Sequence, residues 1–284
     1  VAVAVVSRAL VSVEIPDQRQ ERCISVKPII VIACIGAVMA VMAPSFAQNA
    51  PATPAPAFDE AALIKVLSGD ASWLEKQTAC RALREKGTAA CVPALCALLP
   101  DKELGNVARF ALESLPYPEV SPALRAALPK CEGLPKAGVI TTLGVRRDAD
   151  AVAVIAPLMA DASPEIASAA MGALGRIAAP AAVEALLNAR ASVAQPLRPV
   201  LAEALLAAAQ RLTQLGQGDA AAAIYQEMMA ADWPLFVRMG AFRGLAFAQP
   251  DRAPERLIPA LGGDEPEFCN LAAELESLAA VGQA

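Results

Sequence analysis

The most informative absence in this sequence is histidine. None of the 284 residues is His, which excludes a Ser-His-Asp triad, a Cys-His nucleophile pair, an H-E-x-x-H zinc site and an imidazole general base. Aromatic residues make up only 4% of the chain. No segment alternates apolar and polar residues as a half-buried β-strand does, and no glycine-rich phosphate loop follows a strand pattern. The absence of an alternating strand pattern favours helices over sheets.

Charge and apolar content narrow the class of protein further. The chain has 24 basic and 29 acidic residues, a formal net charge of −5, and this acidic balance argues against nucleic acid as the main partner. Apolar residues make up 56%, far too many for a disordered chain. The length allows one or two ordinary domains or one repeat array.

An apolar run near the N-terminus predicts a secretory signal peptide. Lys27 precedes the run Ile29–Ala43, whose 15 uncharged residues are fewer than the roughly 20 that a spanning helix needs. The run is typical of a secretory hydrophobic region, and Ser45-Phe46-Ala47 provides small residues for cleavage. We therefore predict a signal peptide over residues 1–47, cleavage after Ala47, and a periplasmic or extracellular protein without stable membrane insertion. The alternative is an uncleaved anchor.

The segments on either side of this apolar run have different roles. Residues 1–25 contain acidic residues, which are out of place before a secretory hydrophobic region, so we expect a spurious N-terminal extension and a true start at Val26. Residues 48–58 read QNAPATPAPAF. This Pro/Ala composition predicts an extended linker between the signal peptide and the domain 59–284.

A repeat of about thirty residues fills the remaining chain. A leucine preceded by a small residue recurs at spacings of 29, 31, 31, 31, 40 and 33 residues. The seven leucine anchors are Leu83, Leu112, Leu143, Leu174, Leu205, Leu245 and Leu278. Six of the seven residues that stand four positions earlier are apolar, as one face of a helix requires. Small residues beside the anchors should let helices of adjacent repeats approach closely.

An aspartate stands 11 to 14 residues before five of these leucines. These five residues are Asp70, Asp101, Asp161, Asp232 and Asp264. An aspartate in such a turn can cap the next helix by accepting backbone N–H bonds. Each unit is therefore predicted to consist of a helix A, an Asp turn and a helix B. For residues 59–280 this pattern predicts about seven antiparallel helix pairs without a sheet. A plain helical bundle is the alternative.

The pattern L-x-x-D followed by A-x-x-A-L-G resembles HEAT repeats in their PBS-lyase-like form. The best example is Val154–Gly175, VIAPLMADASPEIASAAMGALG, and the resemblance covers roughly residues 59–280. The whole layout is also similar to exported bacterial HEAT-repeat proteins. The resemblance implies an all-α, armadillo-like right-handed α-solenoid whose B helices line a concave surface, and a scaffold that binds proteins.

One unit departs from the thirty-residue period. Residues 199–231 contain a longer helix running to Leu215 and a Gly-Gln-Gly-Asp turn. The segment resembles a tetratricopeptide hairpin, but we favour a HEAT-like unit with one extended helix because its neighbours are HEAT-like.

The predicted mature chain has five cysteines: Cys80, Cys91, Cys96, Cys131 and Cys269. An exported protein could pair some of them, and the odd number leaves at least one free. Cys91 and Cys96 point about 140° apart on one helix, so they cannot bond to each other there. We expect Cys80 and Cys96 to be small buried apolar residues, and we predict no metal or cofactor.

Among the carboxylates, Asp148 and Asp150 in GVRRDAD come nearest to a catalytic pair. Their place at a helix end favours capping or turn formation instead. We assign no catalytic residue.

Six arginines fall on predicted B helices or just after them: Arg81, Arg109, Arg146, Arg147, Arg176 and Arg243. They are the candidate residues for binding on the concave face. The alternative is that they complement the negative C-terminal ends of helices, but Arg109 is mid-helix. Glu85 and Glu113 stand four residues after Arg81 and Arg109, where ion pairs can form.

We therefore expect an exported, non-enzymatic HEAT-repeat scaffold that binds a protein or peptide, which could be acidic. One alternative is a lyase-type or accessory enzyme of the PBS-lyase-like class, and another is a nucleic-acid-binding HEAT array. Acidic balance and export disfavour the latter.

Overall fold

The computed structural model describes residues 58–282, with side chains described up to residue 278. The predicted signal peptide, the extension 1–25 and all of the linker except Phe58 lie outside the described residues. The described part is all-α: it contains fourteen α-helices and no strand. The predicted fold class is confirmed at this level.

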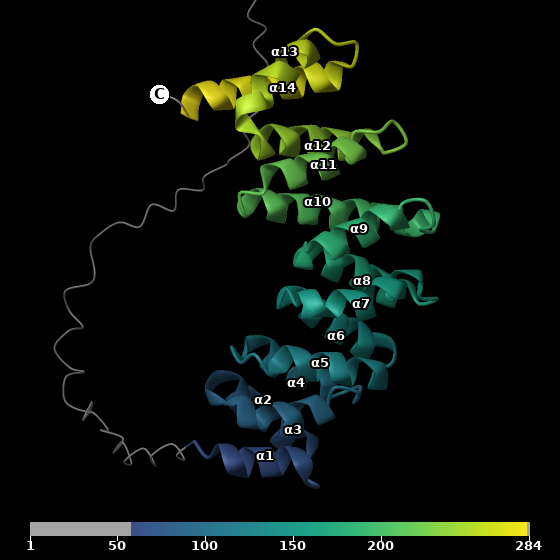
Figure 1. Ribbon diagram of the computed structural model, residues 1–284. Helices are drawn as coiled ribbons and strands as arrows, with labels where there is room; N and C mark the ends of the chain where they lie inside the picture. Colours follow the sequence, from purple (N-terminus) through teal and green to yellow (C-terminus); the bar gives the residue numbers. More distant parts are fainter. Residues whose placement is uncertain (1–57, 283–284) are drawn as a thin grey trace, which may run out of the picture. The chain divides into compact units, whose positions relative to one another are not determined.

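Consecutive helices pack in pairs, and Figure 1 shows the pairs following one another from α1 to α14. In the first half the pairs are α1 (Glu60–Ser68) with α2 (Trp73–Lys86), α3 (Val92–Ala97) with α4 (Gly105–Ser114), α5 (Val120–Ala127) with α6 (Gly133–Val145), and α7 (Val152–Ile155) with α8 (Pro164–Ile177). In the second half they are α9 (Pro180–Ala189) with α10 (Arg198–Gln214), α11 (Gly218–Met228) with α12 (Leu235–Ala248), and α13 (Ala253–Leu261) with α14 (Pro266–Gly282).

Short 3-10 helices extend or precede several helices of these pairs, in most cases the first helix and in one case, η5, the second helix α10. They are η1 (Ala89–Cys91), η2 (Leu128–Lys130), η3 (Ala149–Ala151), η4 (Ala156–Ala160), η5 (Gln195–Leu197) and η6 (Pro250–Arg252). Cys91 therefore lies in η1 and Cys96 in α3, whereas the sequence placed both cysteines on one helix.

The second helices of the pairs contact one another in series: α2 packs on α4, α4 on α6, α6 on α8, α8 on α10, α10 on α12 and α12 on α14. We call this series the B row. The long helix of the irregular unit, α10, keeps its place in the row, and Gly216 with a φ of +73° turns the chain into α11.

Polar side chains at helix starts explain several boundaries. Ser72 forms a capping box with Glu75: the Ser72 backbone N–H donates to Glu75 Oε2 at 2.8 Å. Ser163 Oγ accepts from the Ile166 backbone N–H at 3.4 Å, and Pro164 begins α8. Asp101 accepts backbone N–H bonds from Glu103 and Leu104 in the turn before α4. The N-cap of α4 is Leu104, which makes no side-chain capping bond, so the aspartate orders the turn and does not cap the helix as the sequence predicted.

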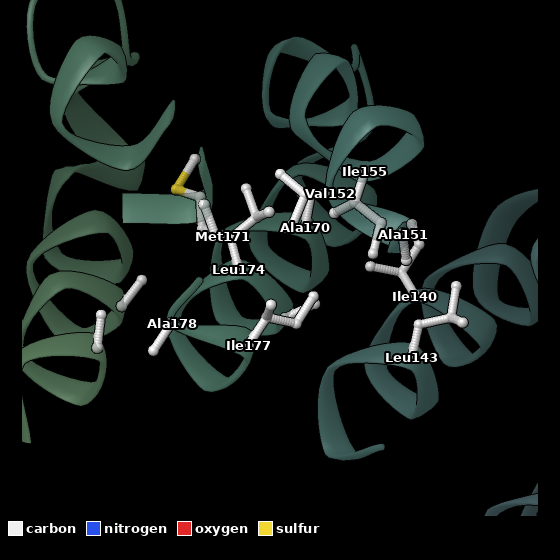
Figure 2. Packing of buried hydrophobic residues seen from close by; sticks show 14 of the residues in the cluster. Ile140, Leu143, Ala151, Val152, Ile155, Ala170, Met171, Leu174, Ile177 and Ala178 are labelled. Carbon is white, nitrogen blue, oxygen red and sulfur yellow. The ribbon is translucent and has the colours of Figure 1, made fainter. Parts of the chain in front are cut away.

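The leucine anchors form the core in all but one pair. Six of them are at most 5% exposed, whereas Leu278 is 48% exposed. In α14 the buried leucines are Leu271 and Leu275, so the prediction for the last anchor was wrong by three residues. Side chains of α6, α7 and α8 meet in the middle of the core (Figure 2), among them Leu143, Ile155 and Leu174.

Small residues bring neighbouring helices of the B row into close approach, as predicted. A Cβ on Gly144 of α6 would lie 2.6 Å from Ala173 Cα of α8. A Cβ on Gly175 of α8 would lie 2.5 Å from the Ala204 carbonyl oxygen of α10. A glycine of one helix therefore lies against an alanine of the next helix at two successive places in the B row, between α6 and α8 and between α8 and α10.

Candidate functional site

The structure separates the six predicted arginines into different environments. Arg109 and Arg146 are largely buried between helices, Arg147 and Arg176 line one surface hollow, Arg81 borders another, and Arg243 pairs with Glu274 at 3.7 Å. The six arginines therefore do not form one continuous binding ridge.

Arg109 joins α4 to α6. Its Nη1 donates to Thr142 Oγ1 at 3.0 Å and to Glu113 Oε2 at 3.3 Å, and the Thr142 hydroxyl donates to the same Glu113 oxygen at 2.9 Å. Thr142 is fully buried, and the Arg109 side chain is 13% exposed. The guanidinium also stacks on Phe110 at 4.2 Å, and its stem lies against Gly138. These contacts make Arg109 a structural clamp.

The predicted pairing of these arginines with carboxylates holds at one position. Glu113 is the partner of Arg109, but within residues 58–278 no ion pair joins Arg81 to Glu85. Arg81 instead lies exposed beside a hollow of about 220 Å³ that Phe110 also lines.

Arg146 closes the C-terminal end of α4 from the next pair of helices. Its guanidinium donates to the carbonyl oxygens of Leu115 at 2.7 Å and Tyr117 at 2.9 Å, and to Ser121 Oγ at 3.1 Å. Burial lowers the pKa of Arg146 from its ordinary value, while the carboxylates of Asp148 and Glu113 act in the opposite direction. Arg146 is therefore committed to the fold.

Arg147 and Arg176 share a hollow with a third arginine, Arg211, which the sequence did not single out. The hollow has a volume of about 300 Å³ and lies where α6, α8 and α10 end. Its other lining residues are Gly144, Val145, Ala207, Gln210 and Gln214. We call it the basic hollow, because no carboxylate lines it.

Local backbone structure places each of these arginines. Arg147 has a φ of +54° and its N–H donates to the Gly144 carbonyl oxygen at 3.0 Å, so it turns away from the end of α6. Arg176 and Arg211 lie in the last turns of α8 and α10. Among the described side chains, no carboxylate forms an ion pair with any of the three.

A second hollow continues the first along the same helices. It also measures about 300 Å³ and shares Arg176 and Ala207 with the basic hollow. Thr141, Ser168 and Glu203 add polar groups to it, and Gly172 contributes to its floor. The small residues of the B row thus leave a continuous depression over α6, α8 and α10.

The sequence contained a signal for Arg211. Gln210, Arg211 and Gln214 stand close together in the sequence. At about 100° per residue, Gln210 and Gln214 point away from the buried face of α10 that Leu201, Leu205 and Leu212 form, and Arg211 lies at its side. Their clustering with Arg147 and Arg176 depends on how α6, α8 and α10 pack.

The carboxylates Asp148 and Asp150 have a role that the sequence did not predict. Asp148 makes no side-chain capping bond, and both carboxylates instead pair with Arg125, Asp150 at 3.4 Å. Side-chain capping by Asp148, one of the two roles expected, is therefore wrong, whereas turn formation is confirmed: the Asp148 N–H donates to the Leu143 carbonyl oxygen at 3.1 Å. The ion pairs link α5 to the chain after α6.

Another cluster of charges surrounds Trp233. Arg190 and Arg198 place their guanidinium groups 5.4 and 5.3 Å from the indole ring, and both pair with Asp232. Desolvation acts to raise the pKa of Asp232, but hydrogen bonds and attraction from the two arginines lower it from its ordinary value. These arginines have partners within the chain, unlike those of the basic hollow.

The five described cysteines are all free. Cys80 is fully buried, as predicted, whereas Cys96 is only partly buried against the core. Burial raises the pKa of the Cys80, Cys91 and Cys96 thiols to about 11, which keeps them protonated and unreactive near neutral pH.

No group of three or more metal-ligating side chains lies together in the part of the chain that the structure describes. None of the helices described is both long and apolar enough to cross a membrane.

Comparisons with known proteins give little on function. No family profile matches the chain, and no curated protein is similar to it in sequence. In structure it is similar to an engineered protein whose crystal structure comes from the Northeast Structural Genomics Consortium, with 20% identity, 76% of this chain and 94% of the other covered, and a TM-score of 0.31. This TM-score is too low to support a common fold.

Proposed function

We propose that this protein is an exported, non-enzymatic HEAT-repeat scaffold that binds a protein or peptide along its B row. The proposed architecture is a right-handed α-solenoid of seven HEAT-like pairs. Support comes from the principal helix contacts, which stay within a pair or join adjacent pairs, as repeat arrays require. Export rests on the apolar run and Ser45-Phe46-Ala47 alone.

The observation that carries the binding function is the continuous depression over α6, α8 and α10. Small residues such as Gly144, Gly172 and Ala207 are among its lining, and they leave room for a partner's side chains. Its open polar groups offer hydrogen bonds to a peptide backbone. No observation on the described residues favours the lyase-type or the nucleic-acid-binding alternative.

A peptide-display selection against the full chain tests this function. Selected peptides should bind the wild type and lose at least tenfold in affinity for Ala207→Tyr, because Ala207 lines both hollows. The matched control is Ala223→Tyr, which introduces the same side chain into an apolar hollow lined by α9 and α11. Peptides that tolerate Ala207→Tyr but not Ala223→Tyr would place binding on the opposite set of helices and overturn the proposal.

A further inference from the structure

The arginines of the basic hollow differ from other arginines of the neighbouring helices because, among the described residues, their side chains have neither an ion pair nor a hydrogen bond. Arg109, Arg125 and Arg190 each pair with a carboxylate, and Arg146 is saturated by carbonyl oxygens. In Arg147, Arg176 and Arg211, three positive charges instead converge on one depression of a chain whose net charge is −5. A scaffold that only needed solubility would not concentrate one sign of charge in this way.

Helix ends do not neutralise these charges. Each of the C-termini of α6, α8 and α10 contributes about half a negative charge. Three such ends offset about half of the three guanidinium charges, so a net positive charge of about 1.5 remains. Like charges gathered around one hollow repel each other, and a bound anion relieves that repulsion.

We propose that the basic hollow binds the acidic side chains of a peptide segment of the partner, and that its continuation, which Glu203 also lines, takes the adjoining residues of that segment. This inference rests on the scaffold function proposed above and names the chemistry of its partner. Glutamate or aspartate side chains would pair with Arg147, Arg176 and Arg211, since guanidinium forks match carboxylates. Side chains such as Gln210 and Ser168 would donate to the peptide's carbonyl oxygens.

The dimensions of the depression set the length of the segment. Packed helices lie about 8–10 Å apart, so the distance from α6 to α10 is about 16–20 Å. An extended peptide rises about 3.3 Å per residue, so about five or six residues span the depression. A peptide is favoured over single-stranded nucleic acid because no aromatic side chain lines either hollow, and bases require such platforms for stacking.

The test uses a fluorescein-labelled peptide of about six glutamates and the full chain, with binding followed by fluorescence anisotropy. We expect binding at low NaCl that disappears at high NaCl, since salt screens such pairs. A glutamine peptide of equal length should not bind. A partly exposed guanidinium–carboxylate pair changes an equilibrium constant by up to about fivefold, so Arg176→Ala and Arg211→Ala should each weaken binding about fivefold, and the double variant about 25-fold.

Arg252→Ala is the matched control, because Arg252 is exposed on η6 and outside both hollows. It should leave the affinity unchanged, and circular dichroism should show that all variants keep the wild-type helix content. Equal weakening by Arg252→Ala would mean general attraction to the surface and would overturn the proposal.

Other ligands provide further outcomes. Tighter Arg176-dependent binding of an oligothymidylate, or of citrate as a free tricarboxylate, would each replace the acidic peptide and overturn the inference. Another outcome is that the glutamate peptide does not bind while the selected peptides still bind and Ala207→Tyr still weakens their binding. In that case the proposal of an acidic partner is wrong and the proposed scaffold function stands. If neither kind of peptide binds, the scaffold function itself fails.

Discussion

The clamp at Arg109 gives the sharpest prediction about stability. Replacing Arg109 with alanine removes its hydrogen bonds to Thr142 and Glu113 and its stacking on Phe110. It also leaves Glu113 with only the Thr142 hydroxyl as a donor. The change should therefore lower the free energy of unfolding without altering the arginines of the basic hollow.

The size of the loss follows from these contacts. Hydrogen bonds to charged groups contribute about 1.5–3 kcal/mol, and a guanidinium on an aromatic ring adds about 0.5–1 kcal/mol. These contacts share one side chain, so their contributions are not additive. We therefore expect Arg109→Ala to lower the free energy of unfolding by about 2–4 kcal/mol, less than the sum over all of its contacts. Arg81→Ala is the control on α2, and removal of this exposed side chain should change stability by no more than about 0.5 kcal/mol.

Urea denaturation followed by circular dichroism measures both variants. Hydrogen exchange locates the loss, because helix pairs that contact mainly their neighbours need not unfold in one step. Protection should fall mainly in α4 and α6. A double-mutant cycle with Thr142→Val should give a coupling energy of at least about 0.5 kcal/mol. If Arg109→Ala stays within about 0.5 kcal/mol of the wild type, or matches Arg81→Ala, the clamp assignment is wrong.

Three further predictions follow from packing and burial. Gly175→Ala should cost about 1–3 kcal/mol in urea unfolding, since its Cβ would lie 2.5 Å from the Ala204 carbonyl oxygen; an unchanged midpoint would contradict the close approach. Leu275→Ala should cost about 2–5 kcal/mol and Leu278→Ala under about 1 kcal/mol, because only the former is buried; the reverse order would restore the anchor read from the sequence. The pKa of Cys80 is raised to about 11, so the folded state holds this proton more tightly than the unfolded state. The contribution of the Cys80 thiol to stability should be complete below about pH 9 and should decline toward pH 11 in urea titrations at different pH values. Rapid reaction of native Cys80 with a disulfide reagent at pH 8 would instead show an accessible thiolate and contradict this prediction.

Arginines at similar positions in the sequence have different roles, because the helices packed against them differ. Arg81 and Arg109 have similar places before their leucine anchors, and both have a glutamate four residues later. Only Arg109 is clamped, because α6 offers it Gly138 as a surface and Thr142 as a buried hydroxyl. The residues on a neighbouring helix thus decide whether an arginine is structural or free to bind.

The sequence by itself determined the helices and most of the core. Leucines about thirty residues apart, apolar residues four positions earlier and capping residues such as Ser163 are local signals, so helix pairs and buried faces follow from helical periodicity. Tertiary structure decided what depends on neighbours. Leu275 rather than Leu278 is buried because α12 and α13 cover one side of α14, and the basic hollow exists because packing brings together the ends of three helices, α6, α8 and α10, that lie far apart along the chain.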